Sequence, residues 1–472
     1  MDCTMLELDL KKTGFFSELV LDYVNGKDSL RPFFSHEPNR DGLLHSIKSR
    51  QNFNTNRNLL VETLIKQYSH VPYSDIIRKQ LDLLKESTTF TITTAHQPNI
   101  FTGYLYFVYK ILHAVKLCRQ AKEWYPQFNF VPVYYMGSED ADLDELGTIF
   151  IDGEPLKWNT DQTGAVGRMD PGSLDTVIER LNGQFSVLPY GKELISIFKS
   201  CYLESDSIQL ATFRLVHQLF EKFGLLVLIP DNAVLKSTMI PVFTDELLHQ
   251  RSSGLVNKTL ADLTSAGYKA QASPREINLF YLDGNKRERI IKEGEEWQVL
   301  NSNIKWKEEE ILTELNTHPE KFSPNVILRG IFQETILPDI AFIGGGGELA
   351  YWLELKGLFN TYQVPFPVLI LRNSFLFVSR EMKNKIEKSG LTTEELFLTE
   401  NEILSRRALQ SAKEQLNIEP EFSKINGLYE QIRNKAMEVD ATLDAHVGAI
   451  KADALKKIHG LQKKMMRAEK RK

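Results

Sequence analysis

A histidine in an amide-rich segment is the first candidate for chemistry. The sequence TTAHQPNIFTG, residues 93–103, places His96, Gln97 and Asn99 where a strand should end and a helix begin. An imidazole at such a point can donate to a transferring phosphate or move a proton, and the two amides can hydrogen-bond a ligand. We assign these three residues as candidate catalytic residues and Gly103 as a nucleotide-binding residue. The alternative is an ordinary strand-to-helix turn in which Asn99 caps the helix.

An acidic cluster is the second candidate. The sequence GSEDADLDE, residues 137–145, holds five carboxylates in seven residues, directly after the apolar run FVPVYYM. Such a cluster can bind a substrate ammonium, hold Mg²⁺ beside phosphates or act as a base. The alternative is a solvated helix N-terminus, where acidic residues favour the helix dipole. We assign Asp140 and Asp142 to catalysis, and Ser138, Glu139 and Asp144 to substrate binding.

A glycine run is the third candidate. The sequence FIGGGGELA, residues 342–350, lies between a predicted strand and a predicted helix. Glycines let the backbone approach a ligand and offer its N–H groups to an anion. The run matches neither GxGxxG nor a phosphate-binding loop that ends in Lys-Ser/Thr, so a tight structural turn is the alternative. The nucleotide-binding candidates are Gly344, Gly345, Gly346, Gly347 and Glu348, together with Ser374 from a later segment.

Two arginines complete the candidate site. Arg329 and Arg372 fall near the ends of predicted elements, and a guanidinium can contact phosphate or carboxylate through two parallel hydrogen bonds. Tyr351 and Asn373 lie near them in the predicted fold, and we assign all four residues to substrate binding. The alternative for each arginine is an exposed or salt-bridged side chain.

A parallel sheet would bring these motifs together. The β-branched run TTFTITT, a long helix after Gly103 and the run FVPVYYM form a strand, helix and strand in that order. A helix over 210–223, the strand LLVLIP and the later strand PVLILRNS continue the alternation. The sequence therefore predicts an α/β fold, in which ligands bind at the carboxyl ends of the strands.

The rest of the chain divides around this core. Residues 149–207 and 251–319 lose clear periodicity and read as insertions, the second with a hairpin whose turn is Asp283-Gly284. We expect a helical lead-in at 1–87, core segments at 88–148, 208–250 and 320–380, the two insertions between them, and a helical coiled-coil segment at 381–472.

The C-terminal segment has an 11-residue apolar repeat. Its 3-4-4 spacing predicts a coiled coil that is nearly straight or slightly right-handed. The seam contains small residues, with Gly448 and Gly460 inside it, so a partner helix must stabilise it. Because the helical pattern runs to Lys472, we expect that partner in another subunit unless the chain is truncated. The seam comprises Ile425, Leu428, Ile432, Ala436, Val439, Leu443, Val447, Ile450, Ala454, Ile458, Leu461 and Met465.

Composition excludes several classes of protein. The chain has 472 residues and a net charge of −5, and its basic residues gather at the end, over 456–472. We therefore expect no nucleic-acid partner, and the short apolar runs predict no membrane span. Three scattered cysteines, Cys3, Cys118 and Cys201, fit neither a disulfide framework nor a zinc site and indicate a reducing cytoplasm.

Four ordered motifs carry a family resemblance. The segments TAHQPNIFTG, VPVYYMGSEDADLDE, FSPNVILRGIFQETILPDIAFIGGGGELAYWLELKGLF and PVLILRNS resemble the bacillithiol cysteine-adding family, BshC. The resemblance implies a Rossmann-like, nucleotidyltransferase-type core, two connecting-peptide insertions and a coiled coil that supports a homodimer. It also implies the joining of cysteine, through its carboxylate, to the amine of glucosaminyl-malate.

The implied reaction requires an activated carboxylate, so we expect ATP to be consumed. The expected nucleotide ligand is ATP or ADP, together with Mg²⁺. Activation by adenylation and activation by phosphorylation both remain open. We expect no zinc, because no Cys/His cluster is visible. Two alternatives to the ligase stay in competition: a non-catalytic nucleotide-binding scaffold, and a nucleotidyltransferase acting on another small acceptor.

Overall fold

The computed structural model describes residues 5–411 and 418–469, which form two compact units. The larger unit is Ser17–Leu376, and the smaller combines Met1–Phe16 with Phe377–Lys472. Cys3 and residues 470–472, which entered the sequence predictions, lie outside the described residues. Among the residues that are described, no helix is both long enough and apolar enough to cross a membrane.

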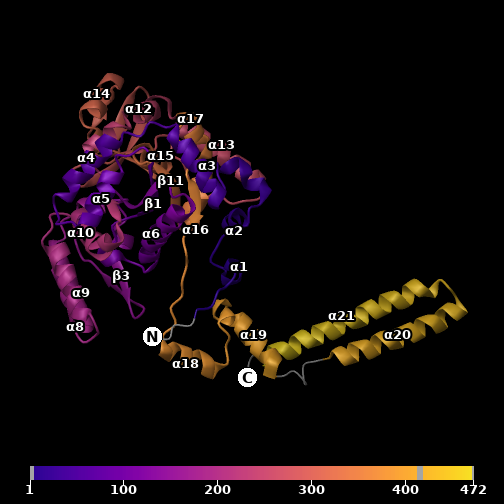
Figure 1. The fold of residues 1–472 in the computed structure, drawn as a ribbon. Coiled ribbons are helices and arrows are strands. Elements are labelled where there is room, and N and C mark those ends of the chain that lie inside the picture. Colours follow the sequence, from indigo (N-terminus) through magenta and orange to yellow (C-terminus); the bar gives the residue numbers. More distant parts are fainter. Residues whose placement is uncertain (1–4, 412–417, 470–472) are drawn as a thin grey trace. The chain divides into compact units, whose positions relative to one another are not determined.

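A parallel sheet is the core of the larger unit (Figure 1). Within the described chain it has five strands in the order β12-β11-β1-β2-β5, and each neighbouring pair is parallel. The strands are buried on both faces, which explains why they read as apolar runs without alternation. The α/β prediction is therefore confirmed. The strands are β1 (Thr89–His96), β2 (Asn129–Met136), β5 (Leu226–Leu228), β11 (Asp339–Gly344) and β12 (Val368–Leu371).

Helices cover both faces of this sheet. Helices α3 (Arg40–Gln51) and α6 (Tyr106–Trp124) pack on one face, where Ile47, Ile92 and Ile343 belong to one apolar cluster. The neighbouring residue Phe342 points to the opposite face because strand side chains alternate, and it stacks on Trp352 of α16 (Gly346–Glu354) at 4.6 Å between centroids. Also in this unit are α2 (Glu18–Val24), α15 (Val326–Ile336) and α17 (Lys356–Tyr362).

The predicted N-terminal helices are present and close one edge of the sheet. Helices α4 (Arg57–Tyr68) and α5 (Asp75–Leu83) match the periodic stretches in the sequence. Gln67 accepts from the N–H of Ile229 at 2.9 Å and donates to the carbonyl of Val227 at 2.8 Å, and the Tyr68 hydroxyl accepts from the N–H of Val227. Side chains thus satisfy backbone groups along the outer edge of β5, which would otherwise be free to pair with another chain.

The two blocks expected to be irregular contain regular structure. The first holds the hairpin of β3 (Thr148–Ile151) and β4 (Glu154–Lys157) and then α8 (Asp175–Phe185) and α9 (Gly191–Phe198), which lead into α10 (Ile208–Phe220). Val177, Ile178 and Leu181 of α8 pack into a local core, a helical spacing that the Gly and Pro residues nearby obscured.

The second block begins with α13 (Arg251–Ser265), which follows α11 (Ala233–Ser237) and α12 (Ile240–His249). It continues with an antiparallel sheet in the order β10-β6-β7-β8-β9 and with α14 (Glu308–Thr317). The predicted hairpin is present, but Asp283 pairs with Lys286, so its two loop residues are Gly284 and Asn285 rather than Asp283 and Gly284. The strands are β6 (Leu279–Asp283), β7 (Lys286–Glu293), β8 (Glu296–Val299), β9 (Lys305–Trp306) and β10 (Phe322–Pro324).

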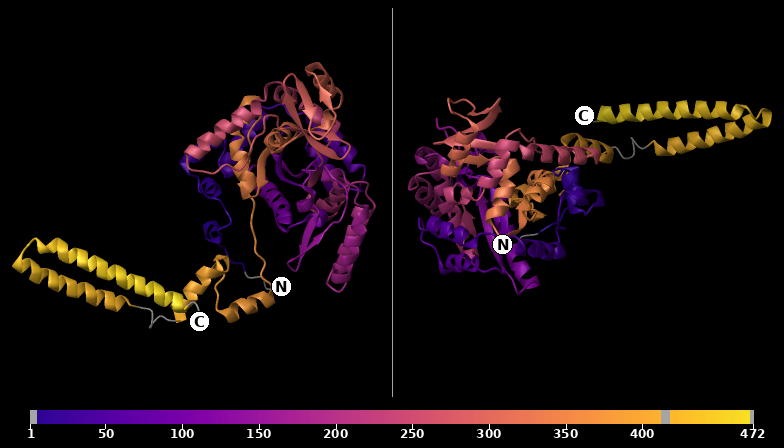
Figure 2. Two further views of the ribbon diagram at one scale, coloured as in Figure 1. Left: turned by 180° about the vertical axis from the view of Figure 1, so that it is seen from behind. Right: turned by 90° about the horizontal axis from the view of Figure 1, so that it is seen from above.

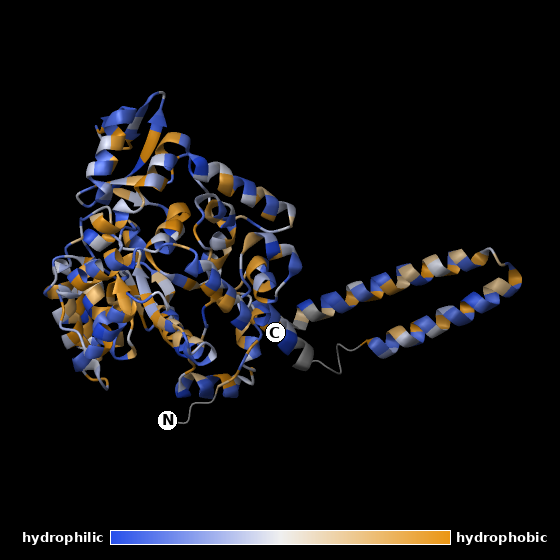
Figure 3. Ribbon diagram, turned by 45° about the horizontal axis from the view of Figure 1, so that its top comes forward, coloured by the Kyte–Doolittle hydropathy of each residue, from blue (hydrophilic) through white to orange (hydrophobic). Residues whose placement is uncertain are grey.

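The smaller unit contains a helical hairpin. It holds α1 (Leu10–Thr13), α18 (Arg380–Ser389), α19 (Glu400–Ser411), and the two long helices α20 (Glu419–Val439) and α21 (Leu443–Glu469). The two long helices lie side by side in both views of Figure 2, and hydrophilic and hydrophobic residues alternate along them (Figure 3). The Arg433 side chain pairs with Asp444, and Lys451 pairs with Glu430 at 2.9 Å.

The expectation that the coiled coil finds its partner only in another subunit is wrong, because α20 and α21 pack on each other within one chain. The helix is interrupted where the Asp440 carboxylate accepts from the N–H and the hydroxyl of Thr442. Such a local bond competes with the helical hydrogen bonds and ends α20. The 3-4-4 spacing continues across this turn, so spacing alone did not reveal it.

Candidate functional site

A cavity of about 590 Å³ opens at the carboxyl ends of β1, β2 and β11. All of its lining residues belong to the larger unit. The lining includes many of the predicted site residues, because parallel strands bring their following loops to one edge. Those residues are His96, Gln97, Ser138, Glu139, Asp140, Arg329, Gly345, Gly346, Gly347, Glu348, Tyr351 and Arg372.

His96 ends β1 with a buried ring nitrogen that faces no partner. Its Nε2 has no hydrogen bond within the described structure, and the ring packs against Tyr106 and Phe107. Burial holds the pKa of His96 well below its usual value of 6.5, and the nearby charges of Lys110, Arg329 and Arg372 lower it further. The imidazole is therefore neutral at pH 7. It can exchange a proton or a hydrogen bond with a ligand, but it does not supply charge.

Arg329 and Arg372 supply positive charge beside His96. Arg329 of α15 donates to the Tyr351 hydroxyl, and the Arg372 guanidinium lies 4.8 Å from the centroid of the Tyr106 ring. Neither arginine has a carboxylate within ion-pair distance in the part of the chain that the structure describes. Their charge is therefore available to an anion in the cavity.

The glycine run is fixed by an ion pair between the buried Lys110 and the half-buried Glu348. Glu348, in the first turn of α16, accepts from the N–H of Gly345 at 2.8 Å and from Lys110 Nζ at 2.6 Å. Lys110 also donates to the carbonyl of Ala95 at 2.5 Å, so it ties β1 to the turn after β11. Burial lowers the pKa of Lys110, and Glu348 opposes that effect. The N-terminus of α16 thus faces the cavity in a fixed position.

The acidic loop contains a second ion pair, which is buried. Glu139 pairs with the fully buried Lys236, which also contacts Asp231 at 3.4 Å. Arg168 holds the two oxygens of Asp231 through two hydrogen bonds of 2.7 Å. Burial raises the pKa of Glu139 although Lys236 opposes the rise. Asp140 has no ion-pair partner among the described residues and accepts from Gln97 Nε2 at 3.1 Å, so its charge is available to a ligand.

A joint made by residues 164–168 holds this loop in place. The N–H groups of Val166 and Gly167 donate to the carbonyls of Asp140 and Ser138 at 2.8 and 2.9 Å. The N–H of Ala165 donates to the carbonyl of Asn285, in the β6–β7 turn, at 2.7 Å. A Cβ at Gly164, whose φ is +94°, would lie 1.9 Å from the Asn285 oxygen, and one at Gly167 would lie 2.3 Å from the Ser138 oxygen. The two insertions therefore meet at the loop that carries the acidic residues.

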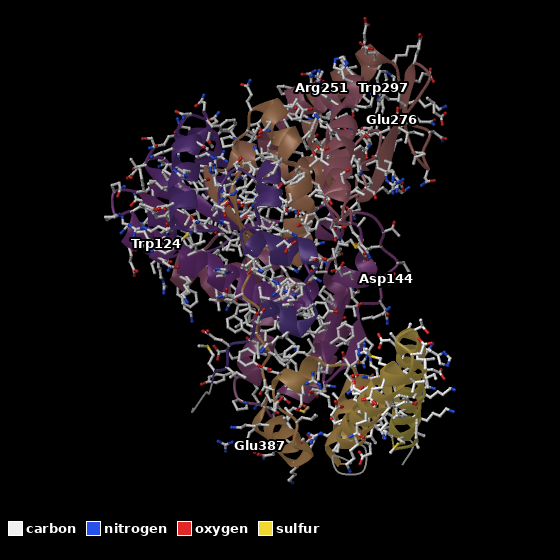
Figure 4. The ribbon with its side chains drawn as sticks, turned by 90° about the vertical axis from the view of Figure 1, so that its right-hand side faces the viewer. Trp124, Asp144, Arg251, Glu276, Trp297 and Glu387 are labelled. Atoms are coloured by element: carbon white, nitrogen blue, oxygen red, sulfur yellow. The ribbon has the colours of Figure 1, made fainter. Side chains whose placement is uncertain are left out.

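The structure places the other predicted residues outside the cavity lining. Asp142 caps α7 (Leu143–Leu146) by accepting from the N–H of Glu145, which is the structural alternative for that residue. Asp144 is 96% exposed and lies 3.8 Å from Lys157. Figure 4 labels it at the surface.

Asn99 is buried, and neither polar atom of its side chain has a partner in the described structure. Asn99 stands at the N-cap position of the short 3₁₀ helix Ile100–Thr102, but its side chain makes no capping hydrogen bond, so the prediction of a side-chain cap is wrong. Gly103 packs on it with φ at +61°. Gly344 is the last residue of β11, Asn373 donates its N–H to His113 Nδ1 at 3.3 Å, and Ser374 accepts from Arg372.

Sequence reasoning missed several residues of the cavity. Arg287 comes from β7 in the second insertion, far from the motifs, and its signal was its place beside the hairpin turn. Lys110 does not line the cavity but holds the lining residue Glu348. It was hidden inside an apolar helix, where a lone lysine on the buried face was the signal. Further lining residues that were not predicted are Tyr106, Tyr135, Glu145, Phe280 and Asn325.

No group of three or more His, Cys, Asp or Glu side chains gathers as a metal site in residues 5–411 and 418–469. Cys118 and Cys201 are unpaired and buried, and burial raises the pKa of both thiols. Neither cysteine lines the cavity.

Comparisons with known proteins match nearly the whole chain. Residues 1–373 match the family model described as the N-terminal Rossmann-like domain of bacillithiol biosynthesis BshC, and residues 375–472 match its C-terminal coiled-coil domain. A relative from Flavobacterium psychrophilum, named "Putative cysteine ligase BshC", is 38% identical over 98% of this chain and 88% of its own length. Proteins of the same name from Flavobacterium johnsoniae and Christiangramia forsetii are 36% and 38% identical, over 98% of this chain and 88% and 87% of their own lengths.

Proposed function

The chain belongs to the BshC family of bacillithiol biosynthesis, and we propose that it is a ligase that joins cysteine to glucosaminyl-malate at the expense of ATP. The name of the relatives supports the ligase class and cysteine as a substrate. The amide bond, the use of ATP and the identity of the acceptor go beyond that name and are our proposal. We also propose a cytoplasmic location and a homodimer formed through the coiled coil.

The observation that carries the proposal is the division of charge in one cavity. Arg329 and Arg372 present unpaired positive charge beside the N-terminus of α16, whereas Asp140 and Glu139 line the same cavity with carboxylates. A ligase of this kind must hold anionic phosphates and an amine close together. The cationic residues suit the phosphates and the cysteine carboxylate, and Asp140, which has no ion-pair partner among the described residues, suits the amine.

The reaction has two bond-forming steps. An oxygen of the cysteine carboxylate attacks a phosphorus of ATP, and pyrophosphate or ADP leaves. The amine nitrogen of the acceptor then attacks the carboxyl carbon, and the C–N bond forms as the bond to AMP or phosphate breaks. The amine loses its proton to a base, for which Asp140 and neutral His96 are the candidates. Mg²⁺ would accompany the nucleotide, with Asp140 and Glu145 as the lining carboxylates available to it.

The test is an assay of the purified chain with MgATP, cysteine and glucosaminyl-malate, in which mass spectrometry detects bacillithiol and chromatography identifies the nucleotide product. We expect bacillithiol in equal amount to either AMP or ADP, and the nucleotide decides between adenylation and phosphorylation. A folded protein that binds nucleotide but forms no product contradicts the proposal.

A double variant separates the ligase from a non-catalytic scaffold. His96→Ala with Asp140→Ala removes two polar groups of the cavity, so we expect turnover to fall by about 10³-fold or more. The matched control is His45→Ala with Asp161→Ala, which alters one exposed histidine and one exposed aspartate outside the cavity. Equal activity of the two double variants would favour the scaffold. Screening other amine acceptors with the wild-type chain tests a nucleotidyltransferase.

A further inference from the structure

Arg287 is a cationic residue of the cavity that the proposed reaction has not yet used. It lies on β7 and reaches the cavity wall between the second insertion and the core. Its Nε donates to Ser323 Oγ at 3.0 Å, its Nη2 donates to the Pro324 carbonyl at 3.3 Å, and its guanidinium lies 3.8 Å from the centroid of the Phe280 ring. These three contacts fix the plane of the guanidinium.

The strand register explains how the residue is held. Arg287 pairs with Leu282 on β6, so Phe280 is its diagonal neighbour on the same face of the sheet. Ser323 and Pro324 belong to β10, which pairs with β6 on its other side. A side chain fixed by three strands is pre-organised to bind a ligand, because little of its conformational freedom remains to be lost.

The charge of Arg287 is not neutralised by a direct ion pair. In the described structure no carboxylate lies within 4.0 Å of its nitrogens, and its Nη1 has no hydrogen-bond partner. Glu139 and Asp140 are the nearest carboxylates that influence it, whereas burial lowers the pKa of the Arg287 guanidinium. Glu139 is already paired with Lys236. A partly buried cation with a free N–H group in a cavity wall is suited to an anionic ligand group.

Arg287 lies in a different part of the cavity from the other two arginines. Arg329 donates to Tyr351 of α16, the helix that follows the glycine run, and Arg372 lies over the ring of Tyr106 in α6. Arg287 instead contacts Phe280 of β6 and Ser323 and Pro324 of β10, and the carboxylates that act on its charge belong to the acidic loop. The cavity therefore has two cationic regions with the carboxylates Glu139 and Asp140 next to the second.

We propose that Arg287 binds a carboxylate of the malyl group of the acceptor. The inference rests on the proposed function and deepens it. The cysteine carboxylate must meet a phosphate, so both belong with Arg329, Arg372 and the N-terminus of α16. The remaining anionic group is the malyl dicarboxylate. The malyl group and the amine stand on neighbouring sugar carbons, so a malyl group on Arg287 brings the amine beside Asp140.

The experiment measures binding without turnover. Isothermal titration of the full chain with glucosaminyl-malate alone, and separately with MgATP alone, is carried out for the wild type, Arg287→Gln and Arg287→Lys. The matched control is Arg289→Gln, an exposed arginine two residues along the same strand and outside the cavity. Thermal melting of every variant checks that each one is folded.

We expect Arg287→Gln to weaken acceptor binding by about 10- to 100-fold and to leave MgATP binding within about twofold, as for loss of one charge-assisted contact. Arg287→Lys keeps the charge without the planar guanidinium, so its affinity for the acceptor should lie between those of the wild type and Arg287→Gln. The affinity of Arg289→Gln should match that of the wild type. Unchanged acceptor affinity in Arg287→Gln, or no acceptor binding by the wild type, overturns the inference. An equal or larger loss for MgATP also overturns it and assigns Arg287 to the nucleotide.

This design distinguishes the two proposals. If the wild type binds the acceptor through Arg287 but forms no bacillithiol, the proposed ligase activity fails and the binding role of Arg287 stands. If the wild type forms bacillithiol and the KM for the acceptor is unchanged in Arg287→Gln, the binding role fails and the ligase stands.

Discussion

Two arginines of the larger unit, Arg50 and Arg329, differ in their burial and in their partners. Arg50 on α3 donates to the carbonyls of Glu334 and Asp339 and to the carboxylate of Glu334 at 2.6 Å, and its side chain is 1% exposed. Arg329 on α15 donates to the Tyr351 hydroxyl. In the described chain, no carboxylate lies within ion-pair distance of Arg329. The N–H groups of Arg50 donate to protein acceptors, whereas Arg329 keeps N–H groups that can donate to a ligand.

The difference separates an arginine whose charge stabilises the fold from one whose charge is open to a ligand. Arg50 joins α3, the end of α15 and the start of β11, and it neutralises a carboxylate that could not stay ionised there alone. Even so, burial raises the pKa of Glu334 to about 7. Arg329 lies on the same helix as Glu334, α15, but it faces the cavity and has no carboxylate partner in the described chain. Substitution of each arginine should therefore change a different property of the protein.

The largest expected effect is on stability, from Arg50→Met. The change leaves Glu334 and several carbonyls buried without their donor, so we expect unfolding to become easier by about 3–5 kcal/mol. Urea denaturation followed by circular dichroism measures this loss. The control Arg78→Met removes an exposed arginine that lies 3.5 Å from Asp75, and it should change stability by less than about 0.5 kcal/mol. Similar midpoints for both variants would contradict a structural role for Arg50.

A smaller free-energy change, in activity rather than stability, is expected from Arg329→Met. Loss of one preorganised donor to the phosphates should lower kcat/KM of the proposed ligation by about 10²- to 10³-fold. The variant should melt near the wild-type temperature, because no ion pair within the protein is broken. Steady-state kinetics and calorimetry check both statements, and Arg329→Lys should recover part of the activity. A large loss of stability with normal kinetics would reverse the contrast between Arg329 and Arg50.

The smallest effect concerns pH and His96. The pKa of His96 lies well below 6.5 in the folded state, so as the pH falls through 6.5 the unfolded chain binds a proton that the folded chain does not. His96 should therefore cost up to about 2 kcal/mol of stability between pH 7 and pH 5, a loss that His96→Gln lacks. Urea denaturation of both proteins at the two pH values measures the difference. Parallel losses in the two proteins would show that burial and the nearby charges of Lys110, Arg329 and Arg372 do not lower the pKa of His96.

Much of the core could be predicted from sequence because its signals are local. The β-branched run of β1, the apolar run of β2 and the glycine run each mark a strand and its end. Parallel order then brings His96, Asp140 and Glu348 to one edge of the sheet. The same reasoning could not tell which carboxylates of the acidic loop face the cavity. Capping by Asp142 and the exposure of Asp144 depend on the short helix α7, which is too short to show a periodic pattern in the sequence.

The residues that sequence reasoning missed depend on contacts between distant segments. Arg287 joins the site through the register of β6, β7 and β10, and Lys236 reaches Glu139 from a helix almost 100 positions later. The fold of the long helices back on each other depends on Asp440, which satisfies a backbone N–H locally while the apolar spacing continues. Such arrangements follow from tertiary geometry, which hydropathy along one chain does not record.

The joint at residues 164–168 has a consequence for protein engineering. Gly164 abuts the β6–β7 turn and Gly167 abuts the acidic loop, each without room for a methyl group. The two insertions are therefore not interchangeable modules, because the first packs on both the β6–β7 turn of the second and the acidic loop. A chimaera that exchanged only one of them for a relative's version would lose the fit between Gly164 and the β6–β7 turn. Exchange of both together would keep that contact, and Gly167 would still have to fit the acidic loop of the core.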